Sequence, residues 1–217
     1  MASFLLEIRT EEIPANALHD ARRQLEQLLT KELADAGFDG FSSRALSTSR
    51  RLAIAVEALP QRQPDSSEQV IGPPVRVAFA DDGTPTKAAE GFARKTGLPL
   101  EEIERLTTDK GEYLAATVAH RGRTTADILG ASVPSVLERI RFPKTMRWGR
   151  GDHLFVRPVH GVVALLDGDV VPIELYGGTS GRVTVGHRVH TPATFEIAAA
   201  DDYQATLEDH GVVVDPE

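Results

Sequence analysis

Five basic side chains lie within twelve positions, residues 139–150, with no acidic residue among them. They are Arg139, Arg141, Lys144, Arg147 and Arg150. The chain as a whole is acidic, with a formal charge of −8, so this cluster departs from the composition around it. Guanidinium groups match phosphate oxygens as paired donors, and Trp148 or Phe142 can stack on an unpaired base. The segment therefore predicts contact with an anionic partner.

A structural interpretation of the same cluster stays open. Arg139 and Arg141 fall at the end of a predicted helix, where positive charge complements the helix dipole, and Trp148 can belong to the core. The basic residues beyond that helix fit this interpretation poorly, and a second, weaker basic pair stands at positions 50 and 51. The candidate residues for contact with RNA or a protein subunit are Lys144, Arg147, Trp148, Arg150, Arg157, His160, Arg50 and Arg51.

Residue types for catalysis, nucleotide binding and metal binding do not form a recognised pattern. No lysine stands in a Gly-Lys-Ser/Thr context, and the chain has neither a Gly-x-Ser-x-Gly motif nor a cysteine. His187 and His190, with His153, His160 and Asp152 upstream, are the best candidates for metal ligands. Two histidines three positions apart on a strand face opposite sides, however. We therefore predict no catalytic residue, no metal site and no cofactor in this chain.

The composition is that of a soluble globular protein. The chain has 217 residues, of which 41% are hydrophobic and 26% charged. The lack of cysteine favours a reducing cytoplasm, and no apolar run reaches the roughly 20 residues of a membrane-spanning helix. The acidic net charge argues against nonspecific coating of nucleic acid but is compatible with recognition through one local patch.

Apolar periodicity predicts an α+β fold with two lobes. A strand at 4–9, a helix that ends near Gly37 and a strand at 50–59 predict a small β-α-β lobe at 1–60. The polar, proline-bearing segment 60–69 predicts a linker. A larger mixed lobe is expected at 68–217, with a mostly antiparallel sheet.

The larger lobe contains most of the predicted elements. The expected strands are at 75–80, 112–119, 154–156, 161–166, 170–176 and 182–187, and the expected helices at 86–96, 101–106, 124–140 and 198–210. The apolar run 212–214 has no element after it, which predicts that the chain is a fragment of a longer one.

Eight short blocks of sequence carry a resemblance to a known family. In order they are TEEIP at 10–14, SRRLA at 49–53, IGPP at 71–74, KAAEGFARKTG at 87–97, RLTTDKGEYL at 105–114, FPKTMRWG at 142–149, FVRPVH at 155–160 and GHRVH at 186–190. Together they resemble the N-terminal third of the β subunit of bacterial heterotetrameric glycyl-tRNA synthetase. The resemblance runs from residue 4 to the end of the chain.

The resemblance implies an α2β2 enzyme that joins glycine to tRNA-Gly with ATP and magnesium. In that family the α subunit holds the class II site for ATP and glycine, and the β subunit mainly recognises tRNA. The family's HD-like and anticodon-binding domains come later in the β subunit. Its N-terminal region is also similar to modules of the phenylalanyl-tRNA synthetase β subunit, which serves here as an indication of fold. No catalytic residue is implied at any position of this chain.

The expected partners are therefore the α subunit and tRNA-Gly, with no membrane. Two other functions stay open. One is a protein–protein scaffold, in which the basic cluster docks an acidic face of the α subunit without touching RNA. The other is an editing-type hydrolase domain, which the synthetase context alone suggests.

Overall fold

The chain folds into two units. In this computed structural model, structure is described for residues 1–80, 82–149, 151 and 153–214. Unit 1 comprises Met1–Gln63 and Arg123–Glu217, and unit 2 comprises Pro64–Gly122. Among the described residues, no helix is long and apolar enough to cross a membrane.

Unit 1 is built on a five-stranded antiparallel sheet with the order β10-β9-β1-β3-β2. Its strands are β1 (Ala2–Thr10), β2 (Ser42–Thr48), β3 (Arg51–Leu59), β9 (Val159–Leu166) and β10 (Asp169–Val170). The central strand β1 is mostly apolar and buried on both faces, because alternate side chains point to opposite sides and both sides are covered.

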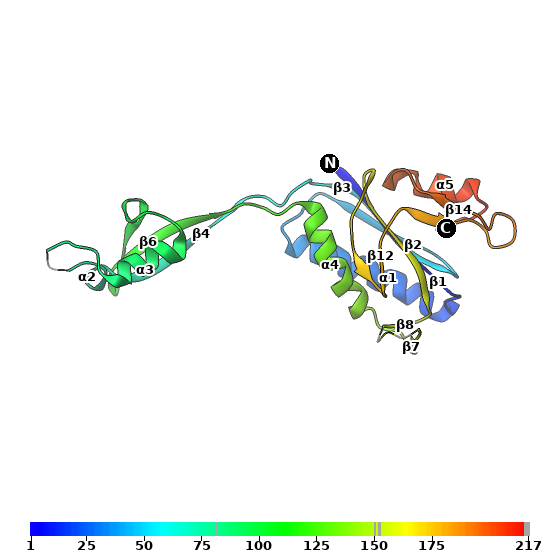
Figure 1. The fold of residues 1–217 in the computed structure, drawn as a ribbon, viewed down its shortest axis with the longest axis horizontal. Coiled ribbons are helices and arrows are strands. Elements are labelled where there is room, and N and C mark those ends of the chain that lie inside the picture. The colour runs from blue at the N-terminus through cyan, green and yellow to red at the C-terminus, as the bar shows by residue number, and fades with distance from the viewer. Residues whose placement is uncertain (81, 150, 152, 215–217) are drawn as a thin grey trace. The chain divides into compact units, whose positions relative to one another are not determined.

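Two long helices cover one face of this sheet. They are α1 (Ala15–Asp35) and α4 (Thr125–Arg139), which contact each other and lie together in Figure 1. Leu25, Leu29 and Leu33 follow one another at four-residue spacing on α1 and are fully buried with Leu6 of β1. This layer forms the larger core of unit 1.

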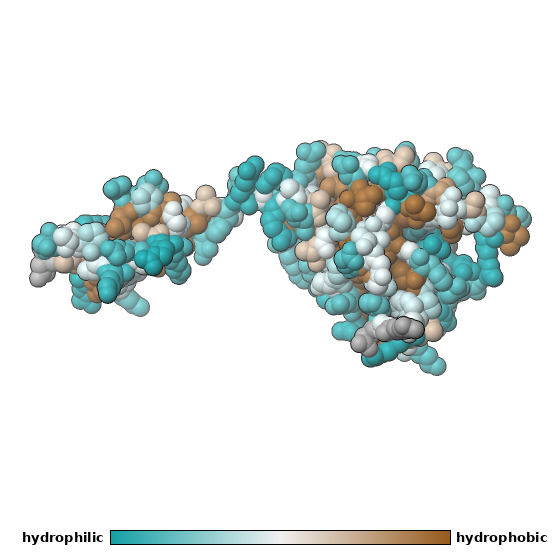
Figure 2. Space-filling view, viewed as in Figure 1, coloured by the Kyte–Doolittle hydropathy of each residue, from teal (hydrophilic) through white to brown (hydrophobic). Residues whose placement is uncertain are grey.

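The opposite face of the sheet is covered by the C-terminal part of the chain. The elements there are η2 (Ala200–Asp202) and α5 (Tyr203–Asp209). Tyr203 and Leu207 pack against Leu5 of β1 and Leu165 of β9. Figure 2 shows apolar residues gathered in the middle of the visible face of unit 1, with hydrophilic residues around them.

Short antiparallel pairs complete unit 1. Strand β7 (Met146–Arg147) pairs with β8 (Leu154–Phe155). The other two pairs join β11 (Glu174–Leu175) to β12 (Gly178–Thr179) and β13 (Val183–Val185) to β14 (Thr194–Glu196). Arg147, one of the basic residues that the sequence analysis selected, lies on β7.

Unit 2 is a three-stranded antiparallel sheet with helical segments. Its elements are β4 (Ser66–Pro74), α2 (Val75–Ala78), α3 (Lys87–Thr96), η1 (Leu100–Glu102), β5 (Glu104–Thr108) and β6 (Gly111–His120), and the strand order is β4-β6-β5. Thr86 caps α3 by accepting a hydrogen bond from the Ala88 amide, and Gly97 ends it with a φ of 72°. Phe92 of α3 and Leu114 of β6 belong to the core of this unit.

The α+β class with mostly antiparallel sheets is confirmed. The arrangement of the N-terminal segment differs from the expected β-α-β lobe at 1–60. An edge strand with few apolar residues, β2, follows α1. The chain then turns at Ser49 and Arg50 into β3, which runs antiparallel to both β2 and β1. Strand β9 pairs with the other side of β1, which places residues 123–217 in the same unit as the N-terminus and not with 68–122.

Two local predictions are wrong. The segment 75–80 begins with the helical turn α2, because Pro73 and Pro74 precede it and proline suits a helix start. Residues 101–106 form the end of η1 and the start of β5, and not one helix. The predicted linker at 60–69 contains the boundary between the units, at Gln63 and Pro64, and only its last part is strand, since β4 begins at Ser66.

Candidate functional site

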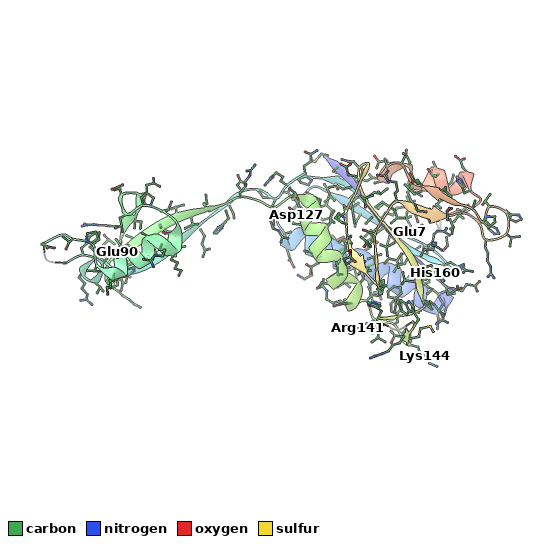
Figure 3. The ribbon with its side chains drawn as sticks, viewed as in Figure 1. Glu7, Glu90, Asp127, Arg141, Lys144 and His160 are labelled. Atoms are coloured by element: carbon green, nitrogen blue, oxygen red, sulfur yellow. The ribbon has the colours of Figure 1, made fainter. Side chains whose placement is uncertain are left out.

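The basic segment follows the end of α4. Lys144 and Arg147 are exposed, and Arg147 lies on β7 opposite Leu154 of β8. Figure 3 shows Arg141 and Lys144 at the same end of unit 1. Arg150, which the sequence analysis also selected, lies outside the described residues. The exposed cations therefore include two of the predicted contact residues.

Trp148 is half-buried and belongs to a group of aromatic rings. Its ring centroid lies 5.8 Å from that of Tyr176 and 6.4 Å from that of His153. Tyr176 in turn packs 5.2 Å from Phe155, which is fully buried in the main core. Burial raises the pKa of the Tyr176 phenol, and the nearby Glu138 carboxylate adds to the effect. Trp148 thus anchors the basic segment to the core while keeping part of its surface accessible.

Arg139 and Arg141 tie the end of α4 to α1. The Arg139 guanidinium forms an ion pair with Glu32, with Nη2 2.6 Å from Oε1. The backbone amide of Arg141 donates to Gln24 Oε1 at 2.8 Å, and Gln24 Nε2 donates back to the Arg141 carbonyl at 3.1 Å. For Arg139 this geometry matches the structural interpretation.

Arg157 and His160 lie beside the basic segment in sequence but have contacts of their own. Arg157 is half-buried, and its Nη1 donates to the carbonyl of Val156 at 2.8 Å. His160 Nε2 lies 2.8 Å from Glu11 Oε1. The hydrogen bond with His160 lowers the pKa of the Glu11 carboxyl, and the charge of Arg50 acts in the same direction.

Arg50 and Arg51 are adjacent in sequence but occupy different environments. Arg50 Nη2 donates to Glu11 Oε2 at 2.9 Å, which links it to His160. Arg51 has only 6% of its side chain exposed, and its Nε donates to the fully buried Glu7 at 3.1 Å. The hydroxyl groups of Thr184 and Tyr203 each donate to the same carboxylate at 2.6 Å. Arg51 is thus part of a buried hydrogen-bonded network.

A pocket of 530 Å³ opens beside Arg50. It is lined by residues 48–51, 185–189 and 211–213, together with Arg9, Glu12 and Pro192. The sequence analysis did not select Arg9 or Arg188, and it did not foresee that the segments SRRLA and GHRVH meet. Both segments were noted for the resemblance, but they are more than 130 positions apart, so only the pairing of distant strands brings them together.

Asp152, which was weighed as a metal ligand, lies outside the described residues, and the histidines weighed with it belong to no described group that could hold a metal. His187 and His190 stack on each other with their ring centroids 4.5 Å apart. His187 Nδ1 accepts hydrogen bonds from the backbone amides of Val189 and His190 at 3.2 Å. Among the described residues, which exclude Asp152, no three His, Asp or Glu side chains gather as a metal site requires.

Comparison with known proteins decides the family. The family model described as glycyl-tRNA synthetase beta subunit matches residues 4–217. The chain belongs to this family. It is 44% identical over 217 residues to the glycine–tRNA ligase beta subunit of Nitratidesulfovibrio vulgaris strain Miyazaki F, covering all of this chain and 31% of that protein. It is 44% identical to the one from Syntrophotalea carbinolica, with 99% of the chain and 31% of the relative covered.

A more distant relative gives the same picture. The glycine–tRNA ligase beta subunit of Trichodesmium erythraeum is 40% identical and is matched over 99% of this chain and 30% of its own length. The chain thus spans about a third of the length of these relatives. The basic segment and the Arg50 pocket both lie within the residues that match the glycyl-tRNA synthetase beta subunit family.

Proposed function

We propose that this chain forms part of the β subunit of a cytoplasmic glycine–tRNA ligase, which joins glycine to tRNA-Gly with ATP and magnesium. In this proposal the enzyme is an α2β2 tetramer, and its α subunit holds the site for ATP and glycine. The observation that carries the proposal is the family match over residues 4–217, with 44% identity to a glycine–tRNA ligase beta subunit. The chain itself contributes contacts and not the chemical step.

The proposed contact with tRNA lies on the basic surface, which we define as Lys144, Arg147, Trp148, Arg157 and His160. Exposed cations in an otherwise acidic chain support this assignment, because phosphate contacts supply most of the binding energy between proteins and nucleic acids. The half-buried Trp148 ring beside them offers a surface on which an unpaired base can stack. Arg50 is a further contact candidate through its chain of bonds to Glu11 and His160.

The test reverses charge on this surface in the complete ligase. We expect Lys144→Glu combined with Arg147→Glu to weaken tRNA-Gly binding. The slope of log K against log salt should fall in magnitude by about 1.4 to 1.8 for the two residues, since each lost phosphate contact removes about 0.7–0.9. Filter binding of labelled tRNA at several salt concentrations measures both quantities.

Lys31→Glu combined with Lys110→Glu is the matched control, because it reverses the same number of exposed charges at distant positions in the sequence. Equal tRNA affinity and equal salt slope in the test and control variants would contradict the RNA assignment. A loss of α-subunit association without a loss of tRNA affinity would assign the basic surface to the subunit interface. Deacylation of mischarged tRNA by this chain would favour the hydrolase alternative.

A further inference from the structure

The Arg50 pocket lies in unit 1 where β1 ends and the chain turns from β2 into β3. The loop after β13 and residues 211–213 close its other sides. Its volume of 530 Å³ falls within the roughly 300–1,000 Å³ that is usual for small-ligand sites. The pocket is therefore large enough for more than a single inorganic ion.

Two arginines in its wall have unused hydrogen-bonding capacity. Arg9 Nη2 donates to the His160 carbonyl at 3.3 Å, and Arg50 Nη2 donates to Glu11 at 2.9 Å. Among the residues that the structure describes, Arg9 Nε and Arg50 Nη1 are buried and have no hydrogen-bond partner. A buried donor without a partner is unfavourable, so these two guanidinium groups have hydrogen-bonding capacity that the described protein atoms do not use.

Positive charge accumulates around this pocket beyond what its own acidic residues offset. Burial lowers the pKa of the Arg9 guanidinium, and the charges of Arg51 and Arg50 act in the same direction, while Glu7 opposes them. Glu7 is already hydrogen-bonded to Arg51. Repulsion among neighbouring guanidinium groups is relieved by a bound anion, as in phosphate sites built from several arginines.

The rest of the pocket lining includes one exposed cation and several apolar side chains. Arg188, with 73% of its side chain exposed, adds a further cation to the lining. Val189 and Val213 are 74% and 69% exposed, and Pro192 lies beside them. The lining of the pocket thus combines cations with exposed apolar side chains of the kind that cover a sugar or a base.

We propose that this pocket binds a nucleotide, with its phosphate held by Arg9, Arg50 and Arg188 and its sugar or base against Val189, Pro192 and Val213. The inference deepens the proposed function, because a nucleotide within an RNA chain is one source of such a phosphate. A free nucleotide is the other source. No residue of the basic surface lines this pocket, so the two assignments are tested by different variants.

Glu12 also lines the pocket, and its substitution tests the proposal in the opposite direction from the arginine variants. Its Oε1 lies 3.9 Å from Arg50 Nη1 and 4.0 Å from Arg188 Nη1, which is beyond hydrogen-bond distance in both cases. The negative charge of Glu12 thus offsets part of the positive charge of Arg50 and Arg188 that would attract a phosphate. Glu12→Gln removes this competing charge and is expected to tighten nucleotide binding.

The experiment is calorimetric titration of the chain with AMP, adenosine and inorganic phosphate at low salt. We expect AMP to bind more tightly than either of its parts. Arg188→Gln and Arg50→Gln should each weaken AMP binding about tenfold, and Glu12→Gln should strengthen it several-fold. Lys31→Gln, which removes one exposed charge on α1, should leave it unchanged. Arg188 is exposed, so its variant retains the fold even if the Arg50 variant does not.

Other outcomes of these titrations would overturn the proposal or identify the source of the nucleotide. Equal affinity for adenosine and AMP, or for phosphate and AMP, overturns the nucleotide proposal, as does binding that Arg188→Gln and Glu12→Gln do not change. Preference for a short glutamate peptide over AMP also overturns it. A single-stranded oligoadenylate that binds more tightly than AMP and responds to Arg188→Gln identifies RNA as the source, and the reverse order identifies a free nucleotide. Loss of tRNA affinity in the Lys144 and Arg147 variant with normal AMP binding leaves this proposal standing.

Discussion

Replacing Arg51 by methionine should strongly destabilise unit 1. The substitution removes the guanidinium partner of Glu7, which has 1% of its side chain exposed, and leaves two hydroxyl donors for the carboxylate. It also removes the donor to the Val185 carbonyl. Breaking a buried ion pair from one side costs about 3–5 kcal/mol, a large part of the roughly 5–15 kcal/mol that stabilises a typical protein.

Urea denaturation followed by tryptophan fluorescence measures this cost, because the single tryptophan, Trp148, is half-buried in the same unit. Arg23→Met is the control, since Arg23 pairs with Asp20 on the exposed surface of α1 and should cost less than about 1 kcal/mol. Adding Glu7→Gln to Arg51→Met should restore part of the lost free energy, because a neutral amide still accepts from the hydroxyl groups. A cost no larger than that of the control, or strictly additive effects in the double variant, would refute the reasoning.

Two further predictions concern pH and close packing. Burial and the Glu7 carboxylate raise the pKa of Tyr203, so the folded state keeps a proton that the unfolded chain loses near pH 10. The free energy of unfolding should therefore fall above about pH 10, and Tyr203→Phe should flatten this fall in urea titrations at several pH values. In unit 2, Gly72→Ala places a methyl group 2.8 Å from the Phe92 ring and should cost about 1–3 kcal/mol. The control is Gly91→Ala on α3, where the added methyl group meets open space and should stabilise the protein by up to about 1 kcal/mol. Circular dichroism during thermal unfolding compares the two variants. Equal shifts in their melting temperatures would contradict the packing argument.

The local elements with strong periodicity could be predicted from the sequence. Helices α1, α3 and α4 and the central strand β1 show clear apolar patterns and were expected close to where they occur. Strand β2 escaped prediction because an edge strand with few apolar residues has a weak pattern. The helical turn α2 was mistaken for a strand because four residues are too short for a helical period to appear.

The sequence likewise predicts one part of the candidate site and not another. A cluster of cations in one stretch, from Arg139 to Arg147, is visible in the sequence because its members are neighbours along the chain. Arg50 lines a pocket, whereas Arg51 is buried against Glu7. The sequence does not distinguish them, because both are arginines at the start of the same predicted strand.

By itself, the sequence determined the α+β class, the main helices and the family to which the chain belongs, since these depend on local periodicity and on the identity of residues in order. Only the tertiary structure decided that β9 joins β1, that residues 64–122 form a separate unit, and that Arg9, Arg50 and Arg188 surround one pocket. The physical reason is that strand pairing and burial bring together residues as far apart as Glu7 and Tyr203, which are 196 positions apart, and no local pattern records which distant partner a strand selects.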